Sequence, residues 1–97
     1  MINLKSIPFP LPVVASRIMD GEAVLVHPGK GEVKVLNELG AEIWKLLDGT
    51  RSVRQIVDEL IRAYAVERVD LERDVLQFVG SLHQRDLIAI RDADENP

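Results

Sequence analysis

Residues 33–49, VKVLNELGAEIWKLLDG, change their hydrophobic period from two to about 3.6 with no loop in between. Val33 and Val35 alternate with Lys34, which is typical of a strand. Asn37 follows as a suitable N-cap, and the apolar residues after it recur at helical spacing: Leu39, Ile43, Leu46 and Leu47. Gly49 suits the position just past a helix end. Because the strand passes directly into the helix, the position of one fixes where the other begins.

Two more strands are predicted upstream of this junction. Residues 13–19 read as a strand that ends at the turn pair Asp20-Gly21, and residues 23–27 read as a second, nearly all-apolar strand. The loop 28–31, Pro-Gly-Lys-Gly, returns the chain into the strand at residues 32–36. Short connections of this kind predict a three-stranded antiparallel meander.

Two further helices are predicted downstream. The second opens at Ser52, because Ser52 and Gln55 fit the capping box S-x-x-Q. The third opens near Asp70, whose charge suits a helix N-terminus. Their apolar stripes are Val53, Ile56, Val57, Leu60, Ile61 and Tyr64 in the second helix, and Leu71, Val75, Phe78, Val79 and Leu82 in the third.

The predicted fold is therefore α+β and winged helix-turn-helix-like, a three-stranded antiparallel sheet followed by three helices. Pro8, Pro10 and Pro12 make residues 1–12 an extended arm, which either covers apolar surface or is loose. We expect the folded domain at residues 13–90, with a short apolar exit at 87–90, and a polar tail at 91–97.

Composition narrows the function. The chain has 97 residues, a formal net charge of −4 and no cysteine, and it carries no apolar run of membrane-spanning length and no signal-peptide pattern. We therefore expect a single cytoplasmic domain without a membrane or nucleic-acid partner. His27 and His83 are far apart and make a poor metal set. Since no phosphate loop or nucleophile–base motif occurs either, we predict no enzyme, no metal and no cofactor.

A winged helix raises one alternative function, that of a DNA-binding regulator, in which the third helix would enter the major groove. Phosphate contacts need lysine and arginine on that helix. Between Asp70 and Asp86 the chain has four acidic residues against two arginines, and the wing loop offers only Lys30. The charge pattern disfavours this alternative.

Several short motifs together carry a resemblance to a known family: Arg17, Gly21-Glu22, Val24-Leu25-Val26 and Pro28, then Leu36-Asn37, Gly40-Ala41, Ile43-Trp44 and Leu46-Leu47-Asp48-Gly49, and finally Val53, Gln55-Ile56, Tyr64, Asp74-Val75 and Leu87-Ile88. In this order they resemble the PqqD family, the precursor-peptide recognition element of ribosomal peptide-modifying (RiPP) pathways. The resemblance covers roughly residues 13 to 90. Members that serve pyrroloquinoline quinone synthesis typically carry a threonine-alanine pair and a cysteine where this chain has Leu39-Gly40-Ala41 and Leu47.

The resemblance implies a non-catalytic adapter that binds the leader of a precursor peptide and presents it to a modifying enzyme, often a radical-SAM protein. The pathway stays open between coenzyme PQQ biosynthesis and another RiPP pathway. In the family the leader adds as a strand to the third strand of the meander and lies against the third helix. The matching strand positions here are Val33, Lys34, Val35 and Leu36.

Helical spacing predicts which residues of the third helix would contact a bound peptide. Leu76, Gly80 and His83 form a second row beside its apolar stripe. A glycine inside a helix costs about 1 kcal/mol against alanine, so Gly80 either admits a peptide backbone or packs closely against another part of the chain. Residues 33–36 have one lysine and no proline to protect the strand edge, so the arm or a second copy, forming a homodimer, are alternative occupants.

Overall fold

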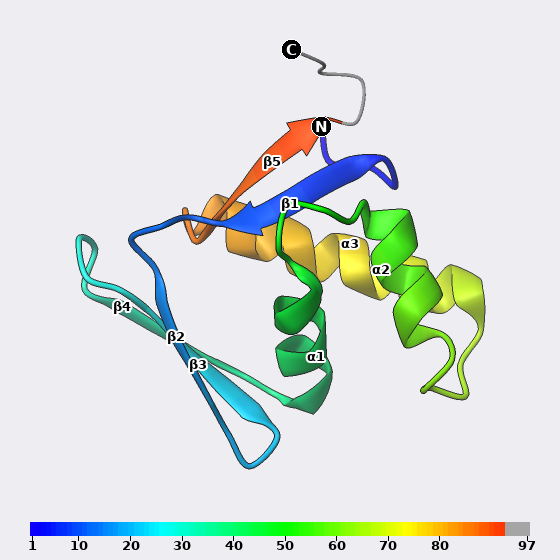
Figure 1. The fold of residues 1–97 in the computed structure, drawn as a ribbon, viewed down its shortest axis with the longest axis horizontal. Helices are drawn as coiled ribbons and strands as arrows, with labels where there is room; N and C mark the ends of the chain where they lie inside the picture. Colours follow the sequence, from blue (N-terminus) through cyan, green and yellow to red (C-terminus); the bar gives the residue numbers. More distant parts are fainter. Residues whose placement is uncertain (93–97) are drawn as a thin grey trace.

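A computed structural model of the chain describes residues 1–92. Its elements, in chain order, are β1 Ser6–Pro10, β2 Ala15–Met19, β3 Glu22–His27, β4 Glu32–Leu36, α1 Glu38–Leu46, α2 Val53–Leu60, α3 Arg68–Gln84 and β5 Ile88–Asp92. Figure 1 shows the β2–β3–β4 sheet extending to the lower left of the three helices, with β1 and β5 above α1. The predicted α+β fold, a three-stranded antiparallel sheet with three helices, is confirmed.

The three-stranded sheet has β3 at its centre and β2 and β4 at its edges. Both pairings are antiparallel, and β3 faces β4 with Ala23 opposite Leu36 and Val26 opposite Val33. The four-residue loop at 28–31 closes this hairpin as the glycines and proline there predicted, and Gly31 adopts a positive φ of 64°.

Local capping sets the helix ends. The side chain of Asn37 accepts a hydrogen bond from the Gly40 amide at 2.8 Å, so α1 begins directly after β4. Ser52 and Gln55 form the predicted capping box at the start of α2. The third helix begins at Arg68, two residues before the predicted Asp70, and its N-cap Glu67 forms no side-chain hydrogen bond.

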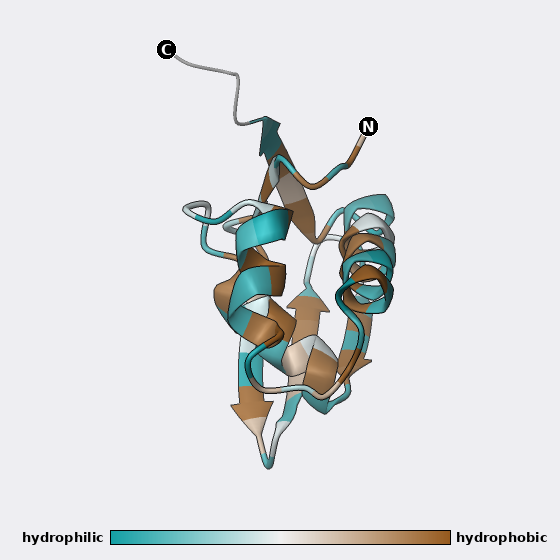
Figure 2. Ribbon diagram, turned by 90° about the vertical axis from the view of Figure 1, so that its right-hand side faces the viewer, coloured by the Kyte–Doolittle hydropathy of each residue, from teal (hydrophilic) through white to brown (hydrophobic). Residues whose placement is uncertain are grey.

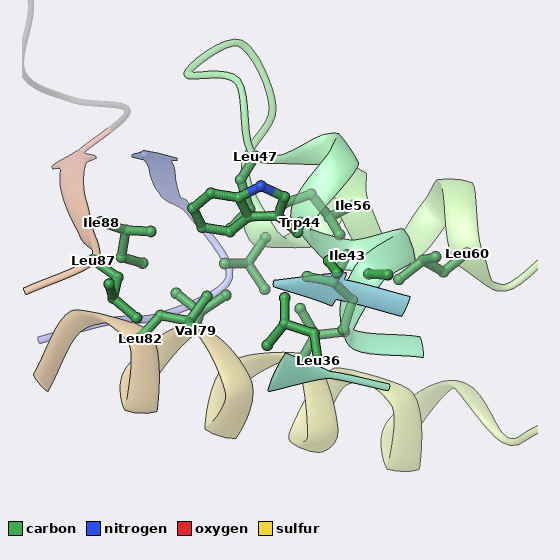
Figure 3. Packing of buried hydrophobic residues seen from close by; sticks show 14 of the residues in the cluster. Leu36, Ile43, Trp44, Leu47, Ile56, Leu60, Val79, Leu82, Leu87 and Ile88 are labelled. Carbon is green, nitrogen blue, oxygen red and sulfur yellow. The ribbon is translucent and has the colours of Figure 1, made fainter. Parts of the chain in front are cut away.

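The core lies where the sheet, the three helices and β5 meet (Figure 3). Its buried residues are Ala23, Leu25, Leu36, Ala41, Ile43, Trp44, Leu47, Val53, Ile56, Val57, Leu60, Leu71, Val75, Val79, Leu82, Leu87 and Ile88. Hydrophobic and hydrophilic residues alternate along the helices in Figure 2, as amphipathic helices require. No helix within residues 1–92 is long and apolar enough to cross a membrane.

A second, two-stranded sheet joins the two ends of the chain, and the sequence did not predict it. β1 pairs antiparallel with β5, with Pro8 opposite Ile90 (Figure 1). The proline-rich arm is therefore not loose: Ser6 and Pro8 are fully buried. The strand also includes Arg91 and Asp92, which were predicted to belong to the polar tail, and residues 93–97 of that tail lie outside the described part.

Candidate functional site

β4 presents an open edge. It pairs with β3 on one side, and no strand within residues 1–92 pairs with its other side. Val33 and Val35 expose 63% and 61% of their surface, which is unusual for adjacent valines on one face of a strand. Among residues 1–92 neither proline nor a covering strand protects this edge, so its outward N–H and C=O groups are available to another chain.

The two faces of β4 differ in character. Leu36 is buried, and the partner of Lys34 across the sheet is the buried Leu25, so both side chains lie on the core-facing side. Val33 and Val35 lie on the outer side, opposite Val26 and Val24. A strand added to β4 would therefore meet apolar neighbours on the outer face and a lysine on the inner face.

A hollow of about 350 Å³ continues the line of β4 at its C-terminal end, between the start of α1 and the middle of α3. Its lining residues are Asn37, Leu39, Gly40, Ile43, Asp74, Gln77 and Phe78. Gly40 keeps this hollow open, because a Cβ on Gly40 would lie only 3.2 Å from Phe78 Cε1 and from Leu36 Cβ. The hollow is mixed in chemistry, apolar on the α1 side and partly polar on the α3 side.

The α3 residues that line the hollow are not the ones that the sequence predicted to contact the peptide. Asp74, Gln77 and Phe78 line the hollow. Leu76, Gly80 and His83 lie about 140° to 160° around the helix from Phe78, since each residue advances an α-helix by about 100°. These three residues therefore lie on the other flank of α3 from the hollow, because periodicity locates the apolar stripe but not which side of it faces β4.

Gly80 has open space around it. A Cβ added there would meet no atom within 4 Å, so internal close packing, one of the two predicted reasons for this glycine, is wrong. Its position on the flank away from Phe78 also separates it from the β4 edge.

An ion pair ties the far end of β4 to the end of α3. Lys30, in the β3–β4 loop, donates from Nζ to Asp86 Oδ2 at 2.6 Å, and Asp86 follows α3 with a positive φ of 59°. The hydrogen bond from Lys30 lowers the pKa of the Asp86 carboxyl below its ordinary value. In Figure 1 the β3–β4 loop extends toward the end of α3 that leads into β5. The ion pair therefore helps to hold the spacing between β4 and α3.

The described residues offer this site little reactive chemistry. No group of three or more histidines, cysteines, aspartates or glutamates in residues 1–92 is placed to hold a metal ion. Two buried side-chain atoms near the hairpin loop, His27 Nδ1 and Glu32 Oε2, have no hydrogen-bond partner. What the site presents is a strand edge with main-chain donors and acceptors, an apolar outer face and a neighbouring hollow.

Comparison with known proteins gives consistent matches over this region. The sequence model of a family described as "Coenzyme PQQ synthesis protein D (PqqD)" matches residues 22–88. A protein of Xanthomonas oryzae pv. oryzae named "PqqA binding protein" is 33% identical over 67 residues, which is 69% of this chain and 71% of that protein. A protein of the same name from Xanthomonas euvesicatoria pv. vesicatoria is 31% identical over the same shares.

Solved structures match almost the whole fold. The structure of TbiB1 in complex with the TbiA(beta) leader peptide has a TM-score of 0.78 and 29% identity, covering 92% of this chain and 99% of that one. Lasso peptide synthetase B1 complexed with its leader peptide has a TM-score of 0.77 and 29% identity, covering 86% and 98%. The PqqD truncation of Methylobacterium extorquens PqqCD, at 23% identity and a TM-score of 0.77, covers 92% of this chain and 95% of that one and shares the fold.

Proposed function

Because the chain belongs to the PqqD family, as the motif order of its sequence predicted, we propose that it is a peptide-binding adapter. It binds the leader of a ribosomally made precursor peptide by adding the leader as a strand to β4. It presents the peptide to a modifying enzyme and carries out no catalysis itself. Two relatives with 29% identity that were solved with leader peptides support this proposal, as does the name of the Xanthomonas relatives.

The observation that carries the proposal is the open edge of β4 beside α3. Strand addition takes its affinity from main-chain hydrogen bonds and its selectivity from alternate side chains. Val33, Lys34, Val35 and Leu36 supply the edge, and the hollow beside Phe78 receives whatever side chain follows at the end of β4. A single added strand buries little area, so contacts in the hollow are needed for useful affinity.

The partner enzyme and pathway follow from the proposed role. The recipient of the presented peptide is a peptide-modifying enzyme, such as a radical-SAM protein, in coenzyme PQQ biosynthesis or in another RiPP pathway. A short precursor gene beside a radical-SAM or cyclase gene would identify the pathway. A second copy of the chain is the competing occupant of β4, and a homodimer formed through this edge would block leader binding.

DNA binding, the alternative raised by the winged-helix shape, has no support among the relatives. The helix that would enter the major groove carries Asp70, Glu72 and Asp74 in its first half. Two of the arginines near it are engaged in ion pairs, Arg68 with Asp58 and Arg73 with Asp70. An acidic helix of this kind repels phosphates.

The experiment that tests strand addition is a proline scan of β4. In a paired strand the amides of alternate residues point to opposite sides, so Val33 and Val35 share one direction and Lys34 and Leu36 share the other. Proline removes one donor. Where the amide points toward β3, we expect proline to damage the fold. Where the amide points away from β3, we expect the fold to survive, as judged by circular dichroism, while peptide binding is lost.

The ligand for this scan is a linear peptide selected on the wild-type protein from a displayed random library. Amide shifts of the isotope-labelled protein on titration should be largest at residues 33–36 and at Gln77 and Phe78. Amide shifts confined to α2 or to the β3–β4 loop, with no change in the amides of β4, would refute strand addition. So would an outward proline that keeps full affinity.

A further inference from the structure

The two faces of β4 also specify the chemistry of the bound leader. We infer that the leader places three consecutive residues opposite Val33, Lys34 and Val35, and that these are an apolar, an acidic and an apolar residue in that order. The inference rests on the proposed strand addition and goes beyond it by naming the sequence class that the protein selects.

The outer positions follow from the valine surface of the sheet. Val24 and Val26 of β3 lie on the same face as Val33 and Val35 of β4, directly opposite them. β2 continues the two rows with Arg17 and Ala15. Residues opposite one another on neighbouring strands share a face, so the leader residues beside Val33 and Val35 extend this surface. Apolar, and especially β-branched or aromatic, side chains are favoured there because they cover the two most exposed valines of the sheet.

The central position follows from Lys34. Its side chain lies on the opposite face, which is the face toward the core, and it is half-buried. Within residues 1–92 it forms neither an ion pair nor a side-chain hydrogen bond. Glu32 lies two residues away on the same face but makes no ion pair with it. A carboxylate of the leader directly opposite Lys34 would give this lysine an ion-pair partner, because opposite charges on paired strands attract.

The pattern does not depend on the direction of the leader. Whether the leader runs parallel or antiparallel to β4, three consecutive residues meet the three positions, and the middle one faces Lys34. A second copy of β4 makes a different pattern. Pairing centred on Lys34 would put two lysines opposite each other, which is unfavourable, whereas pairing centred on Val33 would put Glu32 opposite Lys34. A dimer is therefore an outcome that the experiment must separate from peptide binding.

The test is a comparison of peptide selections. A displayed library of linear peptides, each about a dozen residues long, is selected on the wild-type protein and on Lys34→Glu. Arg17→Glu, on the other edge strand β2, is the matched control with the same change of charge. We expect the wild type and Arg17→Glu to enrich an apolar–acidic–apolar triplet, and Lys34→Glu to enrich the same triplet with lysine or arginine at its centre.

Affinities measured by titration calorimetry make the test quantitative. A selected peptide with a central aspartate should bind Lys34→Glu about tenfold more weakly than the wild type, since attraction becomes repulsion across the pair. Val33→Thr and Val35→Thr should each weaken binding about threefold by removing apolar contact on the outer face. Val69→Thr, an equally exposed valine on α3, is the control and should leave the affinity unchanged.

The outcomes separate the inference from the proposed function. Peptides that shift the amides of β4 but show no acidic preference, or the same preference on Lys34→Glu, would overturn the triplet and leave strand addition standing. Selected peptides that bind away from β4, or a failure to select any peptide from a monomeric protein, would overturn both. If sedimentation shows that the wild type is a dimer and that Lys34→Glu is a monomer, the edge of β4 is occupied by a second copy and the inference is wrong.

Discussion

Substituting alanine for two helical glycines, Gly40 and Gly80, should change the stability of the protein in opposite directions. Both lie inside helices where alanine has the higher propensity, Gly40 in α1 and Gly80 in α3. They differ in what a new methyl group would meet. At Gly80 no atom lies within 4 Å, whereas at Gly40 the methyl would lie 3.2 Å from Leu36 Cβ and Phe78 Cε1 and 3.3 Å from Asn37 Oδ1.

The magnitudes follow from these contacts. Gly80→Ala gains helix propensity at no steric cost and should stabilise the protein by about 0.5 to 1 kcal/mol. For a domain of this size that raises the melting temperature by about 4 °C. Gly40→Ala gains the same propensity but must displace Phe78 or Leu36 and crowd the cap of α1. Overpacking costs about 1 to 3 kcal/mol, so after the gain in propensity the net change should be a loss of about 1 kcal/mol.

Thermal and urea unfolding followed by circular dichroism measure both values. Peptide binding supplies a second readout: Gly80→Ala should bind as the wild type does, because Gly80 lies on the flank of α3 away from β4. Gly40→Ala should weaken binding, because its methyl group enters the hollow beside Phe78. A melting temperature of Gly80→Ala several degrees below that of the wild type would contradict the open space around Gly80. Loss of peptide binding in Gly80→Ala but not in Gly40→Ala would contradict the position of the peptide beside Phe78.

The remaining predictions concern one cap and one ion pair. Ser52→Ala removes the capping box of α2 and should cost about 1 kcal/mol in urea unfolding, whereas Thr50→Ala, outside the capping box, should cost less. Asp86 has a lowered pKa in the folded protein, so its contribution to stability is present above its ordinary pKa and is lost as the pH falls through the folded value. The stability difference between the wild type and Asp86→Asn should therefore stay constant from about pH 7 to pH 5 and shrink as the pH falls below about 4. Asparagine tolerates the positive φ at this position, and a difference that grows toward acid pH would contradict the assignment.

Local sequence signals predicted most of the fold that carries the site. The strand at 32–36 and the helix that follows it lie where the change of hydrophobic period placed them. Asn37 and Ser52 cap their helices as expected. These signals succeed because a cap or an alternating strand is decided by residues within a few positions of one another. The family resemblance rests on the same block and was confirmed by comparison.

The pairing of β1 with β5 could not be predicted in this way. Its partners are more than 75 residues apart in sequence, as in Ile7 opposite Arg91. Pro8 and Pro10 argue against a strand by local propensity, but prolines are tolerated where their missing amide would face away from the partner strand. A two-stranded sheet with edges on both sides admits them. Tertiary contact, rather than local preference, decides that the arm is part of the folded domain.

Which flank of α3 borders the hollow could not be predicted for a related reason, and α3 shows what a helical pattern does and does not determine. Four residues of the predicted apolar stripe are buried and the fifth, Phe78, is partly buried; the four are Leu71, Val75, Val79 and Leu82. A stripe has two flanks, however, and only the packing of α1 against Phe78 decides which of them borders β4. Gly80 pointed to the other flank because a glycine in a helix can indicate that another backbone approaches closely. Its open surroundings show that a glycine can also stand in a helix where nothing approaches, at the cost in stability that its substitution by alanine should recover.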